Sequence, residues 1–230
     1  VRKTAATGTS TSFESVKSNL SSGIHPQITL GYYLNKYASF EISGGYHFGV
    51  VQIIDNEVYE MLKTYTQTTE QSIQYGFLNP CFVINPGFVK WNPYLGMGVF
   101  VGYSNQMTEE ITNSNSQYLR RYTSSGGNQF GFFGKLGMNY SLNSKWKIFS
   151  ELSFTNATWS PNKKHLNAAI DASGNDIYDG LKPHDVLINY SEDARHGNPG
   201  LPDMSKPQKK QKISLPLDFV SLGLGVRFEF

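Results

Sequence analysis

Charged side chains recur on one face of the strands that the sequence predicts, and some of them could support proton transfer. Enzymes use carboxylates and histidines as general acids and bases, and Glu41, Glu151 and His47 supply these groups. Proton transfer also needs a substrate cleft, which an interior packed with side chains does not offer. We therefore interpret the charges as a salt-bridge network that fills an interior. The whole set is Glu41, His47, Lys135, Lys147, Glu151, Arg227 and Glu229.

The polar stretch 160–212 holds a second group of candidate residues. His165, His184 and His196 lie there among aspartates such as Asp185, and these residue types occur in hydrolase and metal sites. Their irregular spacing matches no metal-ligand motif. We interpret them as solvated residues of a connection, and a hydrolase site built on His184 and Asp185 stays open as an alternative.

The same stretch contains a spacing of oxygen ligands similar to that of a calcium-binding loop. Asp171, Ser173, Asn175 and Asp179 carry the oxygens. Such a loop needs glycine at its sixth position and glutamate at its twelfth, where this chain has aspartate and lysine. The sequence therefore predicts no metal, no cofactor and no catalytic residue.

The elements that position these residues are β-strands, and residues 215–230 show this most clearly. Successive side chains of a strand point to opposite faces. One face of this segment is wholly apolar, whereas the other carries glycines together with Arg227 and Glu229. The first suits lipid and the second a crowded interior. The apolar face consists of Val220, Leu222, Leu224, Val226, Phe228 and Phe230.

The same alternation predicts further strands along the chain. They cover 24–34, 38–50, 67–84, 91–103, 129–142 and 145–155. In the strand 67–84, the apolar residues around Tyr75 and those around Phe82 fall on opposite faces. We therefore expect a β-bulge near Asn79 and Pro80.

Composition is compatible with a membrane barrel and argues against other classes. The 230 residues fit one domain, 1–230, and no run of about 18 apolar residues predicts a transmembrane helix. The net charge of +2 and the lack of a shared aromatic and basic face argue against nucleic acid as a partner. The single cysteine, Cys81, can form no internal disulfide and is expected in packed apolar surroundings.

The predicted connections alternate in length. Short turns are expected at 35–36, 85–90 and 143–144, and long polar connections at 55–66, 104–128 and 160–213. Outer-membrane barrels place short turns in the periplasm and long loops outside the cell. The predicted fold is therefore all-β: an up-and-down antiparallel transmembrane β-barrel in the bacterial outer membrane, with its C-terminus in the periplasm and its long loops extracellular.

Seven strands are evident, whereas bacterial single-chain barrels have an even number, so eight are expected. The eighth should precede Ile24. Either it ends near Ala6 and its earlier part lies outside this chain, or it is short and irregular. We favour the first alternative, with 1–23 as a partial first strand and first loop.

Aromatic and basic residues mark the expected membrane boundaries. Trp and Tyr concentrate at both interfaces of a membrane protein. The predicted belts consist of Tyr32, Trp91, Tyr140 and Trp146 on the periplasmic side and of Tyr46, Tyr103 and Trp159 on the outer side. Cations near the outer rim are either lipopolysaccharide contacts or a solvated basic loop. They are Arg120, Arg121, Lys206, Lys209, Lys210 and Lys212.

The chain resembles the small outer-membrane β-barrel proteins of the OmpA/OmpX-like superfamily, in particular the Bacteroidetes type. The resemblance rests on the segments ITLGYYLNKYASFEISGGYHFG, WNPYLGMGVFVGY, FGKLGMNYSLNSKWKIFSELSF and FVSLGLGVRFEF. It implies an eight-stranded barrel that the barrel-assembly machinery inserts after reading a C-terminal strand with a final aromatic residue. Val226, Phe228 and Phe230 match that signal.

The expected function is that of a non-enzymatic outer-membrane protein, a structural or accessory subunit of an envelope complex. Its expected partners are outer-membrane lipid, lipopolysaccharide and other envelope proteins. Two alternatives stay open, namely a narrow pore or carrier of a small hydrophobic ligand, and a loop-borne hydrolase.

Overall fold

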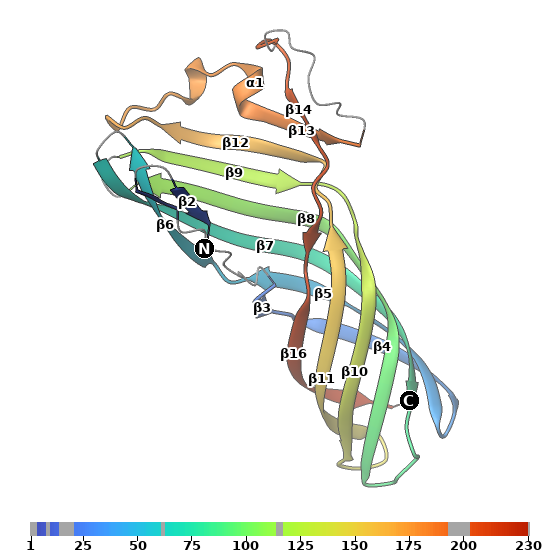
Figure 1. Cartoon of the computed structure of the whole chain (residues 1–230). Helices are drawn as coiled ribbons and strands as arrows, with labels where there is room; N and C mark the ends of the chain where they lie inside the picture. The colour runs from blue at the N-terminus through green and yellow to red at the C-terminus, as the bar shows by residue number, and fades with distance from the viewer. Residues whose placement is uncertain are drawn as a thin grey trace.

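The protein is built almost wholly of strands. Figure 1 shows its computed structural model, in which residues 4–7, 10–13, 21–60, 63–113, 117–192 and 203–229 are described. One sheet has fourteen strands, and a separate sheet pairs β1 (Thr4–Thr7) with β2 (Ser10–Phe13). The helical elements described are η1 (Tyr178–Gly180) and α1 (Pro183–Val186). None of the described helices is long and apolar enough to cross a bilayer.

Seven strands of the large sheet form a curved wall in which every pairing is antiparallel. These are the seven strands that the alternation predicts, although β7 and β8 run further than expected. In spatial order they are β4 (Gln27–Asn35), β5 (Ala38–Gly49), β7 (Lys63–Ile84), β8 (Trp91–Asn113), β10 (Gln129–Ser141), β11 (Trp146–Trp159) and β16 (Phe219–Phe228). Two short strands extend the pairing, β3 (Gly23–Ile24) beside β5 and β15 (Leu215–Pro216) beside β11.

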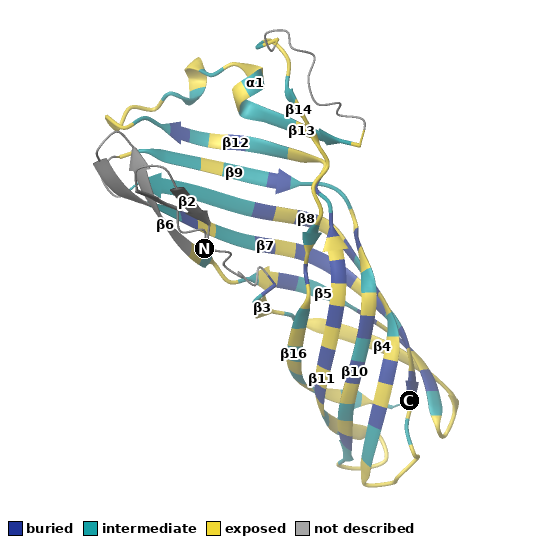
Figure 2. Ribbon diagram, viewed as in Figure 1, coloured by how far each residue is buried: buried dark blue, intermediate teal, exposed yellow. Residues whose placement is uncertain are grey.

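The two-residue alternation decides which side of the wall each side chain faces. Figure 2 shows buried and exposed residues alternating along β10 and β11. On β16 the apolar side chains of Val220, Leu222 and Leu224 are at least 66% exposed, whereas on β5 Glu41 and His47 are buried. The outward face is therefore apolar and the inward face carries the polar groups.

Three short connections lie at one end of the wall, which we call the turn end. They comprise residues 36–37, 85–90 and 142–145. Asparagine side chains stabilise all three: Asn35 Oδ1 accepts the Tyr37 N–H (2.8 Å), Asn85 Oδ1 the Gly87 N–H (3.0 Å) and Asn143 Oδ1 the Trp146 N–H (2.9 Å). The chain also reaches this end after β16, where the Glu229 N–H donates to the Lys145 carbonyl (2.8 Å).

At the opposite end, the extended end, the wall continues as a flat extension that we call the extended sheet (Figure 1). The sequence predicts long loops here, and that prediction is wrong because much of this polar chain forms strands. The described outward side chains of this sheet are mostly polar, so the hydrophobic alternation that signals a half-buried strand is missing. Besides the ends of β7 and β8, the extended sheet contains β6 (Gln52–Glu60), β9 (Leu119–Ser125), β12 (Lys163–Ile170), β13 (Leu187–Ser191) and β14 (Gln208–Gln211).

A bulge at Ser104 separates the two parts of β8. Ser104 has a positive φ of 54°, and β8 uses one more residue than β7 between its pairings with Gly76 and Gln74. The bulge changes which residues of β8 point outward. Before it the odd-numbered residues do so, as Tyr103 shows, and after it the even-numbered residues do, as Gln106 shows. The bulge expected near Asn79 and Pro80 is absent, because β7 pairs with β5 in continuous register there.

The wall is not closed by backbone pairing in the described part of the chain. β4 pairs only with β5, and β16 pairs only with β11. The expectation that an eighth wall strand ends near Ala6 is not met, since Thr4–Thr7 pairs with β2 in the separate sheet and lies beside β6. We call the boundary between the two unpaired edges the β4–β16 seam.

Candidate functional site

Four charged side chains from four strands meet in the interior, and we call them the ionic cluster. Lys135 Nζ of β10 lies 2.6 Å from Glu41 Oε2 of β5 and 3.6 Å from Glu151 Oε2 of β11. Arg227 of β16 reaches Glu41 Oε1 at 3.1 Å. The two cations balance the two carboxylates, and Lys135, Glu41 and Glu151 are each at most 5% exposed. Such a balanced cluster stabilises buried charges that would otherwise be strongly unfavourable.

Tyr94 of β8 completes the ionic cluster. Its hydroxyl donates to Glu151 Oε2 (2.8 Å), and Lys135 and Arg227 lie over its ring at 5.6 and 5.5 Å. The ring occupies the space beside Gly137, where a Cβ would approach Tyr94 Cζ to 2.3 Å. A glycine is therefore required at position 137, and the tyrosine fills the gap that the glycine leaves.

The remaining members of the predicted network lie elsewhere. Glu229 pairs with Lys147 and accepts the Tyr33 hydroxyl (2.5 Å) at the turn end. His47 is not part of either group: its Nδ1 lies 3.3 Å from His25 Nδ1, and its ring stacks on Tyr75 with centroids 4.6 Å apart. The prediction of one network of seven residues is thus corrected to the ionic cluster, the separate Lys147–Glu229 pair and a histidine that contacts His25 and Tyr75 instead.

Towards the extended end the interior is aromatic, which the sequence analysis missed. Tyr75, Phe77 and Phe100 are buried there and pack around one another, with Phe77 and Phe100 stacked at 6.1 Å. Trp159 is also fully buried and donates its Nε1–H to the Gly126 carbonyl (2.8 Å). Its assignment to the outer aromatic belt is therefore wrong, because it faces inward.

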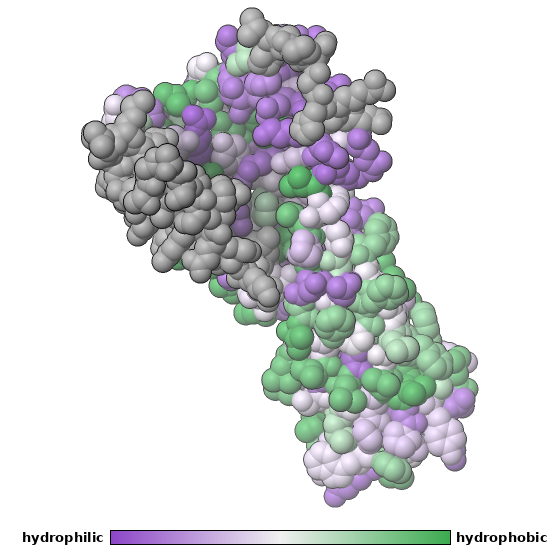
Figure 3. All heavy atoms as spheres, viewed as in Figure 1, coloured by the Kyte–Doolittle hydropathy of each residue, from purple (hydrophilic) through white to green (hydrophobic). Residues whose placement is uncertain are grey.

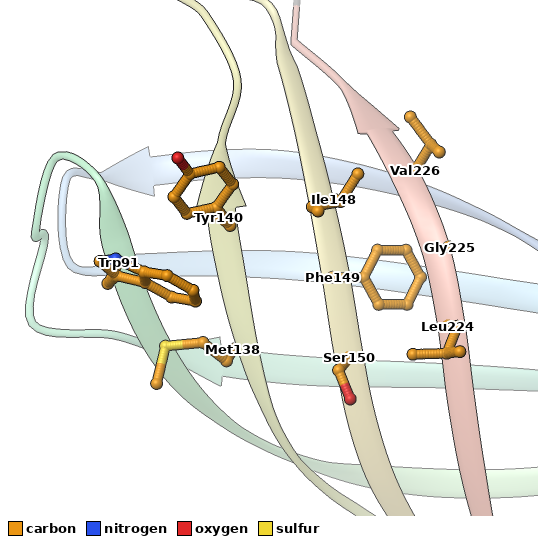
Figure 4. Close-up of a pocket in the computed structure, with 9 residues that line it drawn as sticks. All are labelled: Trp91, Met138, Tyr140, Ile148, Phe149, Ser150, Leu224, Gly225 and Val226. Atoms are coloured by element: carbon orange, nitrogen blue, oxygen red, sulfur yellow. The ribbon is translucent and has the colours of Figure 1, made fainter.

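The other predicted belt residues lie on the outward face. Tyr32, Trp91, Tyr103 and Trp146 are exposed, and Trp91 packs on Tyr140 with ring centroids 4.6 Å apart. Figure 3 shows hydrophobic residues gathered on the wall and hydrophilic residues on the extended sheet. An apolar groove of about 670 Å³ lies near the turn end. Figure 4 shows side chains that line it, among them Trp91, Met138, Tyr140, Ile148, Leu224 and Val226.

The predicted basic contacts do not form one patch. Arg120 and Arg121 are adjacent in β9 and face opposite sides of the sheet, Arg121 pairing with Glu110 (2.7 Å) on the outward face. Lys209 and Lys210 are exposed on β14, Lys212 pairs with Glu192 (3.4 Å), and Lys206 pairs with Asp203 (2.8 Å). Lys163 of β12 pairs with Asn189 of β13, which in turn pairs with Lys209 of β14, so the two lysines lie on the same, outward face. The sequence analysis did not include Lys163 because that residue lay in an expected loop.

The candidate residues of the last connection are dispersed. His165 is hydrogen-bonded to Asn167 on β12, and His184 lies in α1; His196 falls outside the described residues. Asp171 Oδ1 accepts the backbone N–H groups of Ser173 (2.8 Å) and Asn175 (3.0 Å), which forms a turn. These bonds, chiefly that from Asn175, lower the pKa of Asp171. Over the part of the chain that the structure describes, no three metal-ligating residues cluster.

The proposed assembly signal lies at the end of β16. Val226 and Phe228 point outward, and Phe228 packs on Trp146 with ring centroids 4.9 Å apart. Phe230 falls outside the described residues.

A wall of antiparallel strands with an apolar outer face and a charged interior defines an outer-membrane β-barrel protein. Comparison with known families agrees: residues 3–190 match the outer membrane protein beta-barrel domain, and the chain belongs to this family. It is therefore an integral protein of the bacterial outer membrane. No curated protein and no solved structure matches the chain. The Bacteroidetes type stays a prediction.

Proposed function

We propose that this protein is a non-enzymatic structural or accessory component of the outer membrane that acts through its outer surface. The observation that carries the proposal is the filled interior. The ionic cluster occupies the half near the turn end and the buried aromatic residues occupy the half near the extended end. A filled interior supports a role in which the barrel anchors the extended sheet, and it disfavours the alternative of an open pore.

The change of outward face at Ser104 supports one orientation of the protein in the membrane. Between the turn end and the bulge, the outward side chains of β8 are apolar, as in Val99 and Tyr103. Between the bulge and the extended end they are polar, as in Gln106 and Glu110. Apolar side chains belong in the bilayer and polar ones in water, which supports an extracellular extended sheet and a periplasmic turn end. In that orientation the end of β16 faces the periplasm, where the barrel-assembly machinery would meet Val226 and Phe228.

Lipopolysaccharide is the partner that the outward cations suit best. Lys163 and Lys209 are exposed on the outward face of the extended sheet, and neither forms an ion pair with a described residue. Phosphate groups of the outer leaflet would lie beside this face if the bilayer ends near Tyr103. Each lysine near an anionic membrane surface contributes about 1 kcal/mol to binding.

Cross-linking in native outer membranes followed by extraction in mild detergent tests the proposal. We expect the protein to co-purify with lipopolysaccharide or with an envelope protein at a fixed ratio. The double variant Lys163→Ala/Lys209→Ala should bind lipopolysaccharide roughly tenfold more weakly or worse. Lys145→Ala, which removes an exposed lysine at the turn end, is the matched control and should bind normally. A protein that is always solitary and free of lipopolysaccharide contradicts the proposal.

A further inference from the structure

The apolar groove on the outward face of the wall forms around a small side chain, Ser150 of β11. Ser150 pairs with Met138 of β10 on one side and with Leu224 of β16 on the other (Figure 4). Its outward neighbours along β11 are Ile148 and Leu152, so four larger side chains surround it. The resulting volume of about 670 Å³ lies within the range of roughly 300–1,000 Å³ that is typical of ligand sites. We call this hollow the Ser150 groove.

Two aromatic rings border the Ser150 groove on the side of the turn end. Trp91 is the first residue of β8 and Tyr140 lies one residue before the end of β10, so both are nearer to the short connections than Ser150 is. Their ring centroids are 4.6 Å apart. Tryptophan and tyrosine favour the boundary between membrane and water because each ring carries a polar group. The groove therefore runs from this boundary into the apolar band of the wall.

A cation lies beside the boundary end of the groove. Lys90 is exposed, and its Nζ lies over the Tyr140 ring at 5.8 Å from the centroid. The Lys90 carbonyl accepts the Ser141 N–H (3.0 Å), which holds this part of the connection against β10. Lys90 forms no ion pair with any residue that the structure describes, whereas Lys147 at the same end is paired with Glu229. The charge of Lys90 is thus available to an anion at the mouth of the groove.

We propose that the Ser150 groove binds one anionic phospholipid of the leaflet next to the turn end. One acyl chain lies along the groove over Ser150, and the phosphate of the same molecule pairs with Lys90. An apolar groove with a cation at its boundary end matches both parts of such a lipid. The inference rests on the proposed function, because the orientation proposed there places the turn end on the periplasmic side and makes the occupant a phospholipid rather than lipopolysaccharide.

Quenching of Trp91 fluorescence by brominated phospholipid tests the inference, because bromine on an acyl chain quenches a tryptophan that it touches. The protein carries Trp146→Phe, which leaves Trp91 as the outward tryptophan of the chain, since Trp159 is fully buried. It is reconstituted in phosphatidylcholine vesicles that contain an increasing fraction of brominated phosphatidylglycerol. The same titration with brominated phosphatidylcholine gives the quenching that arises without a net anionic headgroup.

We expect the site to bind phosphatidylglycerol about fivefold more tightly than phosphatidylcholine, which is the factor that one lysine contributes near a membrane surface. Lys90→Ala removes the charge and Ser150→Leu fills the groove, so each should abolish the preference. Two matched controls should keep it. Ser150→Ala leaves the groove open, and Lys36→Ala removes an exposed lysine that lies over another ring at the turn end, that of Tyr37 (4.7 Å).

Equal quenching by the two lipids in the protein without further changes would overturn the inference. So would a preference that Lys90→Ala or Ser150→Leu leaves unchanged, or one that Lys36→Ala removes. The vesicles have the same lipids in both leaflets, so the groove is tested whichever end of the protein faces the periplasm. Lipopolysaccharide binding through Lys163 and Lys209 is measured separately, and the proposed function can therefore stand even if the groove binds no phospholipid.

Discussion

Replacing Lys135 with methionine should destabilise the barrel strongly, because among the described residues Lys135 is the only cation within 4 Å of Glu151. Glu41 keeps Arg227 at 3.1 Å, whereas the partner that the described part of the chain leaves to Glu151 is the Tyr94 hydroxyl at 2.8 Å. Removal of one partner from a buried ion pair typically reduces the free energy of unfolding by about 3–5 kcal/mol. A hydrogen bond to a charged group offsets part of this loss, so we expect about 3 kcal/mol for Lys135→Met.

Urea unfolding of the barrel in phospholipid vesicles, followed by the fluorescence of its three tryptophans, measures this loss under reversible conditions. Lys147→Met is the matched control, because its pair with Glu229 is partly exposed at the turn end and should contribute about 1 kcal/mol or less. Adding Glu151→Gln to Lys135→Met should recover part of the loss, since no unpaired carboxylate then remains. If Lys135→Met loses no more stability than Lys147→Met, the ionic cluster does not have the role assigned to it.

Three further predictions follow from single positions. Gly137→Ala should lower the free energy of unfolding by about 1–3 kcal/mol, because the new Cβ would meet the Tyr94 ring at 2.3 Å. Gly134→Ala is the control and should be close to neutral, because no described atom lies nearer than 3.9 Å to its Cβ. Equal urea midpoints for the two variants would contradict this prediction. Leu136→Arg on the outward face of β10 should lower the free energy of unfolding in vesicles by about 2–4 kcal/mol, because this face is expected to contact lipid. Thr108→Arg on the outward face of the extended sheet should lower it by less than about 0.5 kcal/mol, because this face is expected to contact water. Similar losses for the two variants would contradict the proposed position of the bilayer. Because the pKa of Asp171 is lowered in the folded state, its turn should be fully formed above the ordinary aspartate pKa and lost as the pH falls through the lowered value. The protection factor of the Asn175 amide, which is the intrinsic exchange rate divided by the measured one, follows this change; a protection factor that does not vary with pH and equals that of Asp171→Asn would refute it.

The sequence predicts the wall well because each wall strand has one face in contact with lipid. That face must be apolar, so the alternation in 38–50, 91–103 and 215–230 is unbroken and the strands appear nearly where expected. Asparagines at 35 and 143 likewise identify the turns, since their side chains cap the backbone locally. These features depend on neighbours in the chain.

Other features depend on contacts between distant residues and were missed. Tyr75 and Phe77 face inward while Phe82 faces outward, so apolar residues occupy both faces of β7 and no phase change is needed to explain them. The described outward side chains of the extended sheet are mostly polar, which is why its strands resemble loops in the sequence. The sequence does predict that Lys135 and Glu41 join a salt-bridge network, but not that Lys147 and Glu229 form a separate pair, because the register of strands far apart in the chain decides which charges meet.

The central claim is that the interior is filled, so that the protein acts through its surface rather than as a channel. Conductance of the purified wild-type protein in planar lipid bilayers tests this claim most directly. The ionic cluster and the buried aromatic residues predict no stable current step above the lipid baseline. Reproducible, ion-selective steps from the wild-type barrel would contradict the account.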